Sequence, residues 1–166
     1  MHVPETNEKT AMPAPSLYET DFYAWTQEQV SLLSKHQWGQ LDLLNLIEEI
    51  DSLGKQQRQE LRNRLSVLIG HLLKWEYQSQ RRSRSWVATI QVQRLDVSEL
   101  LEENPSLKPY LEEALQKAYA KGVILSVKET ELPRGTFPVE CPYSLTEILD
   151  NSFYPGEPSE LISELE

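Results

Sequence analysis

Three arginines stand close together in the stretch QSQRRSRSWVATI, which covers residues 78–90. Arg81, Arg82 and Arg84 lie within a span of four positions and directly before Trp86. Guanidinium groups bind carboxylates and phosphates through paired hydrogen bonds, so this group is a candidate site for an anion. The same arginines can instead neutralise acidic helices that pack beside them. At the level of the sequence both interpretations stay open.

These arginines belong to a basic segment within an acidic chain. The 166 residues carry a formal net charge of −10, yet residues 55–94 contain nine of the sixteen Lys and Arg and only two acids. That segment therefore carries +7 and the rest of the chain −17. An acidic whole opposes sequence-independent binding of duplex nucleic acid, which depends on phosphate contacts. A local basic surface remains compatible with an acidic protein surface or a phosphate-bearing ligand.

A polar stripe leads along a predicted helix to the arginines. Residues 60, 64, 67, 71, 75 and 78 follow one another at steps of three and four, which places His71 and Trp75 on one stripe with Lys74 at its edge. Beyond the arginines, the first free backbone N–H groups of the next helix offer further anion donors. The predicted anion- or partner-binding residues are Lys74, Arg81, Arg82, Arg84, Ser85 and Trp86.

Three carboxylates on the preceding predicted helix, Glu48, Glu49 and Asp51, complete the set of candidates. They can pair with the arginines as a structural lock. Alternatively, they can line a cleft with His71 and Trp75, which would suit a hydrolase-type enzyme, with or without a divalent metal. Metal-binding spacings such as His-x-x-x-His and Glu-x-x-His are missing around His71, so we expect neither a metal nor a cofactor.

Other catalytic patterns are absent. The chain has no glycine-rich phosphate loop, no Gly-x-Ser-x-Gly and no Cys-x-x-Cys, and Cys141 is its single cysteine. Trp75 and Trp86 both lie on leucine-bearing stripes, which favours a place in the core over stacking against a base. The sequence therefore leans away from an enzyme.

Apolar periodicity predicts the elements that position these groups. It predicts an all-α fold, a single helical bundle of about five main helices at roughly 21–39, 41–54, 55–78, 85–103 and 107–131. Gly54 is suited to end or kink the second of these helices, and Gly70 to let a neighbouring helix approach closely. A proline-rich strap follows, pinned by Phe137 and Tyr143, and a Ser144–Glu147 capping box opens a short helix.

The predicted domain organisation has three parts. Residues 1–16 are expected to be a disordered lead-in, 17–155 the helical-bundle domain, and 156–166 a flexible acidic tail. No apolar run approaches the ~18 residues that a membrane span needs, and the N-terminus lacks the apolar stretch of a secretory signal. We therefore expect a cytoplasmic protein without membrane contact.

Four phrases in this order resemble one known family: LYETDFYAW, LDLLNLIEEIDSLG, HLLKWEYQSQRRSRSW and FPVECPYSLTEILDNSFYP. The family is bacterial, abundant in cyanobacteria, and known only as domain of unknown function family twenty-nine. The resemblance covers about residues 17–155. It implies an all-helical bundle and no established activity.

These observations lead to one preferred hypothesis and two alternatives. We expect a small helical protein-interaction module whose basic connector, residues 78–86, engages an acidic protein surface or a phosphate-bearing ligand. The first alternative is nucleic-acid or nucleotide binding at the same residues. The second is a hydrolase-type enzyme that uses the cleft of acids and His71.

Overall fold

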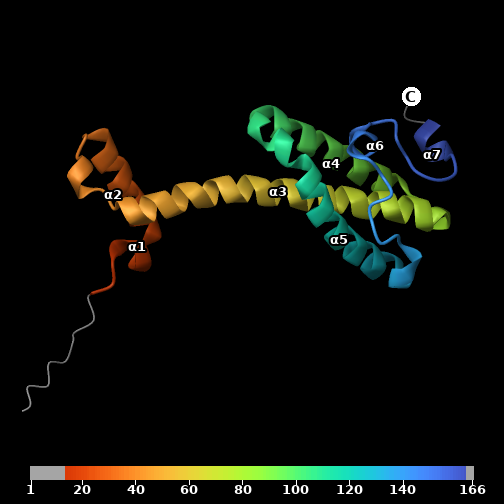
Figure 1. Ribbon diagram of the computed structural model, residues 1–166, viewed down its shortest axis with the longest axis horizontal. Coiled ribbons are helices and arrows are strands. Elements are labelled where there is room, and N and C mark those ends of the chain that lie inside the picture. Colours follow the sequence, from red (N-terminus) through yellow and green to blue (C-terminus); the bar gives the residue numbers. More distant parts are fainter. Residues whose placement is uncertain (1–13, 164–166) are drawn as a thin grey trace, which may run out of the picture. The chain divides into compact units, whose positions relative to one another are not determined.

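The computed structural model describes residues 14–163 (Figure 1). The regular secondary structure of this part is helical, and it contains no strand. The all-α prediction is therefore confirmed. The main helices of this part are α2 (Phe22–Ser34), α3 (Leu43–Tyr77), α4 (Arg84–Glu103) and α5 (Leu111–Thr130). Three helices are short: α1 (Leu17–Thr20), α6 (Leu145–Leu149) and α7 (Glu160–Ser163). Single 3₁₀ segments occupy Trp38–Gln40, Ser79–Arg81, Pro105–Tyr110 and Arg134–Thr136.

The described residues form four main helices where the sequence predicts about five, because α3 runs through Gly54 as one helix of 35 residues (Figure 1). A glycine inside a helix costs about 1 kcal/mol relative to alanine, which is a weak penalty. The residues around Gly54 are mostly leucine, glutamate, lysine and glutamine, which are good helix formers. The φ angle of Gly54 is also not positive, so no left-handed cap ends the helix there.

The chain divides into two compact units, and the boundary falls between Leu53 and Gly54. The first unit contains α1, α2 and the first turns of α3. Asp21 caps α2 by accepting a hydrogen bond of 2.9 Å from the backbone of Ala24, and the chain reverses after α2 at His36, which has a φ of 58°. The helix therefore ends before the predicted Gly39. Between residues 14 and 53 only Trp25 and Gln29 are buried.

The second unit has a continuous apolar core, built from the rest of α3 with α4, α5 and the C-terminal strap. Helices α3 and α5 approach closely at two glycines: a Cβ on Gly122 would lie 3.1 Å from the Ser66 carbonyl oxygen and 3.3 Å from the Gly70 nitrogen. The hydroxyl of Ser126 lies 3.1 Å from the Gly70 carbonyl oxygen. The predicted role of Gly70 is thus confirmed.

The C-terminal strap, residues 132–157 with α6 within it, crosses the second unit as the sequence predicts. Phe137 and Tyr143 are buried, and the Ser144–Glu147 capping box is present at the start of α6. Residues 156–163 differ from the expected flexible tail, because Leu161 and Ile162 pack against the core. Residues 1–13 and 164–166, which the prediction treats as lead-in and tail, lie outside the described residues. None of the helices in the described part combines the length and apolar character needed to cross a membrane.

Candidate functional site

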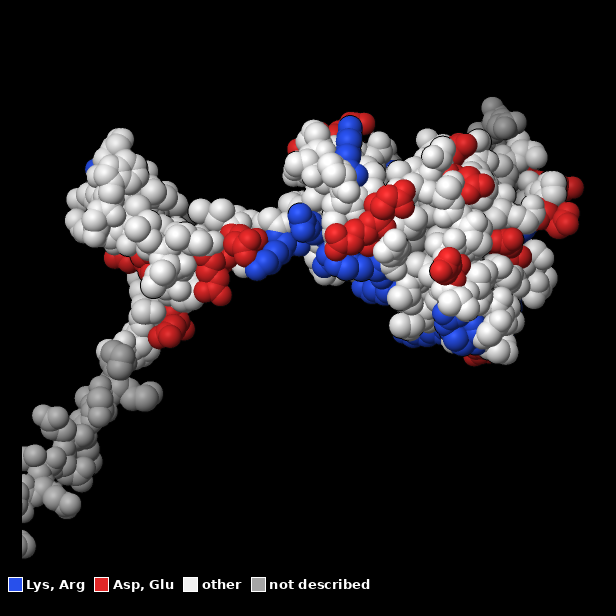
Figure 2. Space-filling model, viewed as in Figure 1, with Lys and Arg blue, Asp and Glu red and all other residues white. Residues whose placement is uncertain are grey.

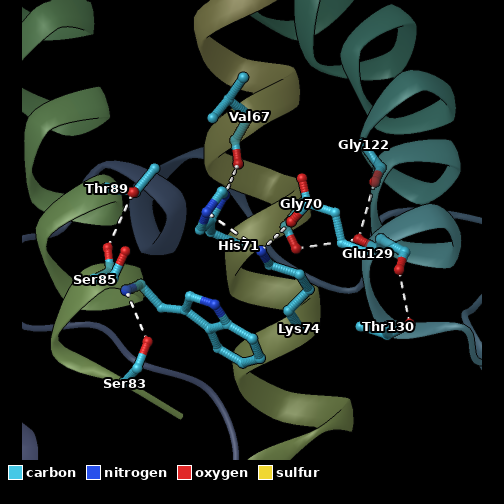
Figure 3. A network of polar contacts seen from close by, with 12 residues as sticks. Val67, Gly70, His71, Lys74, Ser83, Ser85, Thr89, Gly122, Glu129 and Thr130 are labelled. Carbon is cyan, nitrogen blue, oxygen red and sulfur yellow. Dashed lines mark hydrogen bonds and ion pairs between the residues drawn. The ribbon is translucent and has the colours of Figure 1, made fainter. Parts of the chain in front are cut away.

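The polar stripe of α3 meets α5 at His71, Lys74 and Glu129 (Figure 3). His71 and Lys74 are one helical turn apart on α3, and the Lys74 ammonium lies 3.4 Å from Nε2 of His71. The same ammonium forms an ion pair with the Glu129 carboxylate. Trp86 of α4 closes the cluster, since Lys74 Nζ lies 4.7 Å from the centre of its indole ring. These four side chains form what we call the Lys74 cluster.

Hydrogen bonding defines the protonation of His71. Its Nδ1 lies 2.9 Å from the Val67 carbonyl oxygen, which can only accept, so Nδ1 carries the proton and donates it there. Nε2 is then the acceptor for the Lys74 ammonium. Burial lowers the pKa of His71, and the positive charge of Lys74 lowers it further. The one basic nitrogen of the imidazole is therefore occupied, which makes His71 a poor general base.

Lys74 is almost entirely buried, with 3% of its surface exposed. A buried ammonium needs compensation, and here a carboxylate, an imidazole nitrogen and an aromatic face provide it. Because its ammonium is buried, Lys74 does not present its charge to an external anion in the way that the sequence predicts. The Lys74 cluster holds α3, α4 and α5 together at one end of the second unit.

The protonation of His71 should make the stability of the protein depend on pH. Its folded pKa lies below the value of about 6.5 for an unfolded chain, so protonation favours the unfolded state. Its contribution should be complete above about pH 6.5 and decline as the pH falls through 6.5 toward the folded pKa. Between about pH 7.5 and about pH 5, the free energy of unfolding measured in urea should fall more for the wild type than for His71→Gln. Equal losses would contradict this assignment.

The arginines of the connector point in different directions. Arg82 turns inward: its Nε donates to the Trp75 carbonyl oxygen at 2.8 Å and its Nη1 to that of Glu157 at 2.7 Å. Its guanidinium also stacks on the Trp75 ring at 4.6 Å. Arg81, Arg84 and Ser85 are exposed. The structure therefore divides the predicted anion site into an internal half and an external half.

Arg94 of α4 is a second internal arginine, and the sequence reasoning missed it. Its exposed fraction is 3%, and it donates to the carbonyl oxygens of Ile148 at 2.8 Å, Asn151 at 3.4 Å and Phe153 at 2.7 Å. Burial lowers the pKa of this guanidinium. One signal was available in the sequence: Arg94 follows Ile90 by four positions, which places it on the apolar stripe of the helix.

The three carboxylates belong to the first unit, whereas His71 belongs to the second. Glu48 and Asp51 are exposed, and Glu49 accepts a 2.6 Å hydrogen bond from the hydroxyl of Tyr18 in the first unit. This bond raises the pKa of Tyr18 to about 12. Because α3 is continuous, the carboxylates lie about six turns before His71 on the same helix. Among residues 14–163 no group of three His, Cys, Asp or Glu side chains is placed to hold a metal ion.

The first unit carries the feature that the sequence analysis did not anticipate, a set of exposed apolar side chains. The α3 members with the largest exposed fractions are Leu44 at 83%, Ile50 at 67% and Ile47 at 65%. Eleven of the fifteen exposed large apolar residues within 14–163 belong to this unit: Leu17, Phe22, Tyr23, Val30, Leu33, Trp38, Leu43, Leu44, Ile47, Ile50 and Leu53.

The comparisons with known proteins identify a family and no activity. The model of a family described as domain of unknown function DUF29 matches residues 17–154. No curated protein and no solved structure matches the chain.

Proposed function

We propose that this protein is an interaction module whose first unit binds a partner helix. The chain belongs to the DUF29 family of domains of unknown function. The observation that carries the proposal is the concentration of exposed apolar side chains in residues 17–53. Their exposed fractions run from 39% to 83%. Three of the eleven are aromatic, Phe22, Tyr23 and Trp38, and an aromatic side chain buries about 150–250 Å² when a partner covers it.

Single exposed apolar residues are normal on a monomeric protein, whereas their concentration in one part of the chain is typical of an interaction site. The largest apolar patch on a typical monomer covers about 300–600 Å², and a stable interface buries about 800 Å² on each partner. The second unit contrasts with the first, because it buries its apolar residues in a continuous core. The concentration of exposed apolar residues in the first unit therefore supports an interaction surface there.

The charges around this surface define the chemistry of the partner. Residues 14–53 contain seven acids and a single base, Lys35. On α3 the exposed Glu48 and Asp51 flank the apolar stripe formed by Ile47 and Ile50. In Figure 2 the visible face of this unit is mostly uncharged, with acidic atoms beside it and almost no basic ones. The complementary partner is a helix with an apolar stripe flanked by lysine or arginine.

The basic connector gives less support to the predicted anion-binding site than the sequence suggested. Lys74 and Arg82 are engaged inside the second unit, so an acidic protein surface or a phosphate-bearing ligand would meet only Arg81, Arg84 and Ser85. Nucleic-acid binding at the connector would use the same reduced set. The exposed apolar surface is the stronger basis for a function.

Photo-crosslinking tests the proposed surface directly. With p-benzoylphenylalanine in place of Ile47 in the full chain, irradiation in cells should give a covalent adduct of discrete mass. The same group in place of Val139, which is 89% exposed but lies outside the first unit, should give none. Adding Ile50→Asp should remove the adduct from position 47, whereas adding Val139→Asp should not. No adduct from either position 47 or position 43 would refute the proposal.

A further inference from the structure

The middle of α3 is exposed on every side. Residues 53–59 are all exposed, and so is Asp51 before them. The guanidinium of Arg58 stacks on the ring of Tyr110 at 4.8 Å. A helical segment that is exposed to water on all sides gains little stability from packing, which supplies most of the stability of protein helices. Gly54 adds a second observation, since a Cβ built there would meet nothing within 4 Å. The close approach that a glycine allows is therefore not used within one chain.

Two neighbouring rows of side chains run along this exposed segment. One row, which we call the seam, consists of Ile47, Ile50, Gly54 and Gln57 at steps of three and four. The other, which we call the charged row, lies beside it at the same steps. Its members are all exposed: Glu48, Asp51, Lys55 and Arg58.

The charged row changes sign at its centre. Glu48 and Asp51 are acidic, whereas Lys55 and Arg58 are basic, and the two halves mirror each other about Leu53. Figure 2 shows acidic atoms giving way to basic ones along this part of α3. When two copies of such a helix lie antiparallel, the same flank of each faces the other, so the acidic half of one meets the basic half of the other.

We propose that α3 pairs antiparallel with α3 of a second copy of this chain, crossing at Ser52 and Leu53. This inference rests on the proposed function and names the partner of the same surface. In the pair, Glu48 of each copy lies opposite Arg58 of the other, and Ile50 of each lies against Gly54 of the other. The missing Cβ of Gly54 makes room for the isoleucine. The second copy thus supplies the apolar stripe with a basic flank that the surface requires.

The two-fold symmetry of this arrangement allows a charge-swap test. Glu48→Arg and Arg58→Glu each place two like-charge pairs in the dimer, so each should raise the dimer dissociation constant roughly tenfold or more in sedimentation experiments on the full chain. The double variant Glu48→Arg with Arg58→Glu restores both pairs, and its dissociation constant should return to within about threefold of the wild type. Circular dichroism of each variant verifies that the helices remain folded.

The outcomes separate the two proposals. Additive weakening in the double variant, or a wild-type chain that stays monomeric at high micromolar concentration, would overturn the antiparallel pair. If position 47 then crosslinks to a different protein, the interaction module stands and only its partner is wrong. If neither position 47 nor position 43 crosslinks to any protein, both proposals fail.

Discussion

Replacement of Arg94 by methionine should lower the free energy of unfolding by about 3–5 kcal/mol, the sum of its lost hydrogen bonds and the largest loss we expect from any single substitution in this protein. Methionine fills much of the arginine volume, so the loss comes from the hydrogen bonds. Three carbonyl oxygens, those of Ile148, Asn151 and Phe153, would lose their donor. Ile148 is buried, and a buried polar group without a partner costs about 1–3 kcal/mol, whereas water can reach the carbonyl of the exposed Asn151. The stacking of Arg94 over Tyr154 at 5.2 Å is lost as well.

Urea denaturation measures this loss, and hydrogen exchange shows where it acts. The amides of residues 148–155 should exchange faster in Arg94→Met, because Arg94 holds this part of the strap against α4. Arg82→Met is the matched control: Arg82 also binds the strap through carbonyl oxygens but is only partly buried, so water can replace it. We expect that variant to lose about 1–2 kcal/mol in the free energy of unfolding. A loss below 1 kcal/mol in Arg94→Met would contradict the assignment.

Arg82 and Arg94 hold the C-terminal strap through backbone carbonyl oxygens. Each guanidinium donates to three backbone carbonyl oxygens, and each stacks on an aromatic ring. Carbonyl dipoles compensate a buried guanidinium in the way that a carboxylate otherwise would. The expected lock between connector arginines and carboxylates is thus replaced, for Arg82, by a lock on the backbone of the strap. A sequence cannot show this, because every residue carries the same backbone carbonyl group.

Local chemistry made several elements predictable. The capping box of α6 depends on two residues three positions apart, and the stripe that contains Leu61 and Leu65 depends on helical periodicity alone. Gly54 was misread because a mid-helix glycine is compatible with a break, a kink or an uninterrupted helix. The outcome depends on small differences in free energy between these conformations.

The candidate site was less predictable, because periodicity identifies an apolar face but not what covers it. The stripe with Ile47 and Ile50 has the pattern of a core helix, yet both side chains are more than 60% exposed. Lys74 shows the opposite case: it lies at the edge of its stripe and is nevertheless buried, because Glu129 lies 55 positions further along the chain and pairs with it. Contacts over such distances in sequence are set by tertiary packing.

Glu129→Ala should be the second most damaging substitution, with a loss of about 3 kcal/mol in the free energy of unfolding. The side chain of Glu129 is 44% exposed, so its own burial contributes little to this loss. The loss arises from Lys74, whose side chain is 4% exposed and whose ammonium would remain buried without its carboxylate. The neutral Nε2 of His71 and the ring of Trp86 compensate that charge only in part.

A double-mutant cycle separates the ion pair from simple packing. Lys74→Met alone removes the buried charge and keeps an apolar stem of similar length, and the partly exposed Glu129 can then be hydrated, so this variant should lose less than Glu129→Ala. Once Lys74 is methionine, removing Glu129 should cost almost nothing, and the double variant should match Lys74→Met within about 0.5 kcal/mol. Losses that simply add would show that Glu129 acts through contacts other than Lys74. Recovery in the double variant, measured by urea unfolding, would establish that the carboxylate is required because the ammonium is buried.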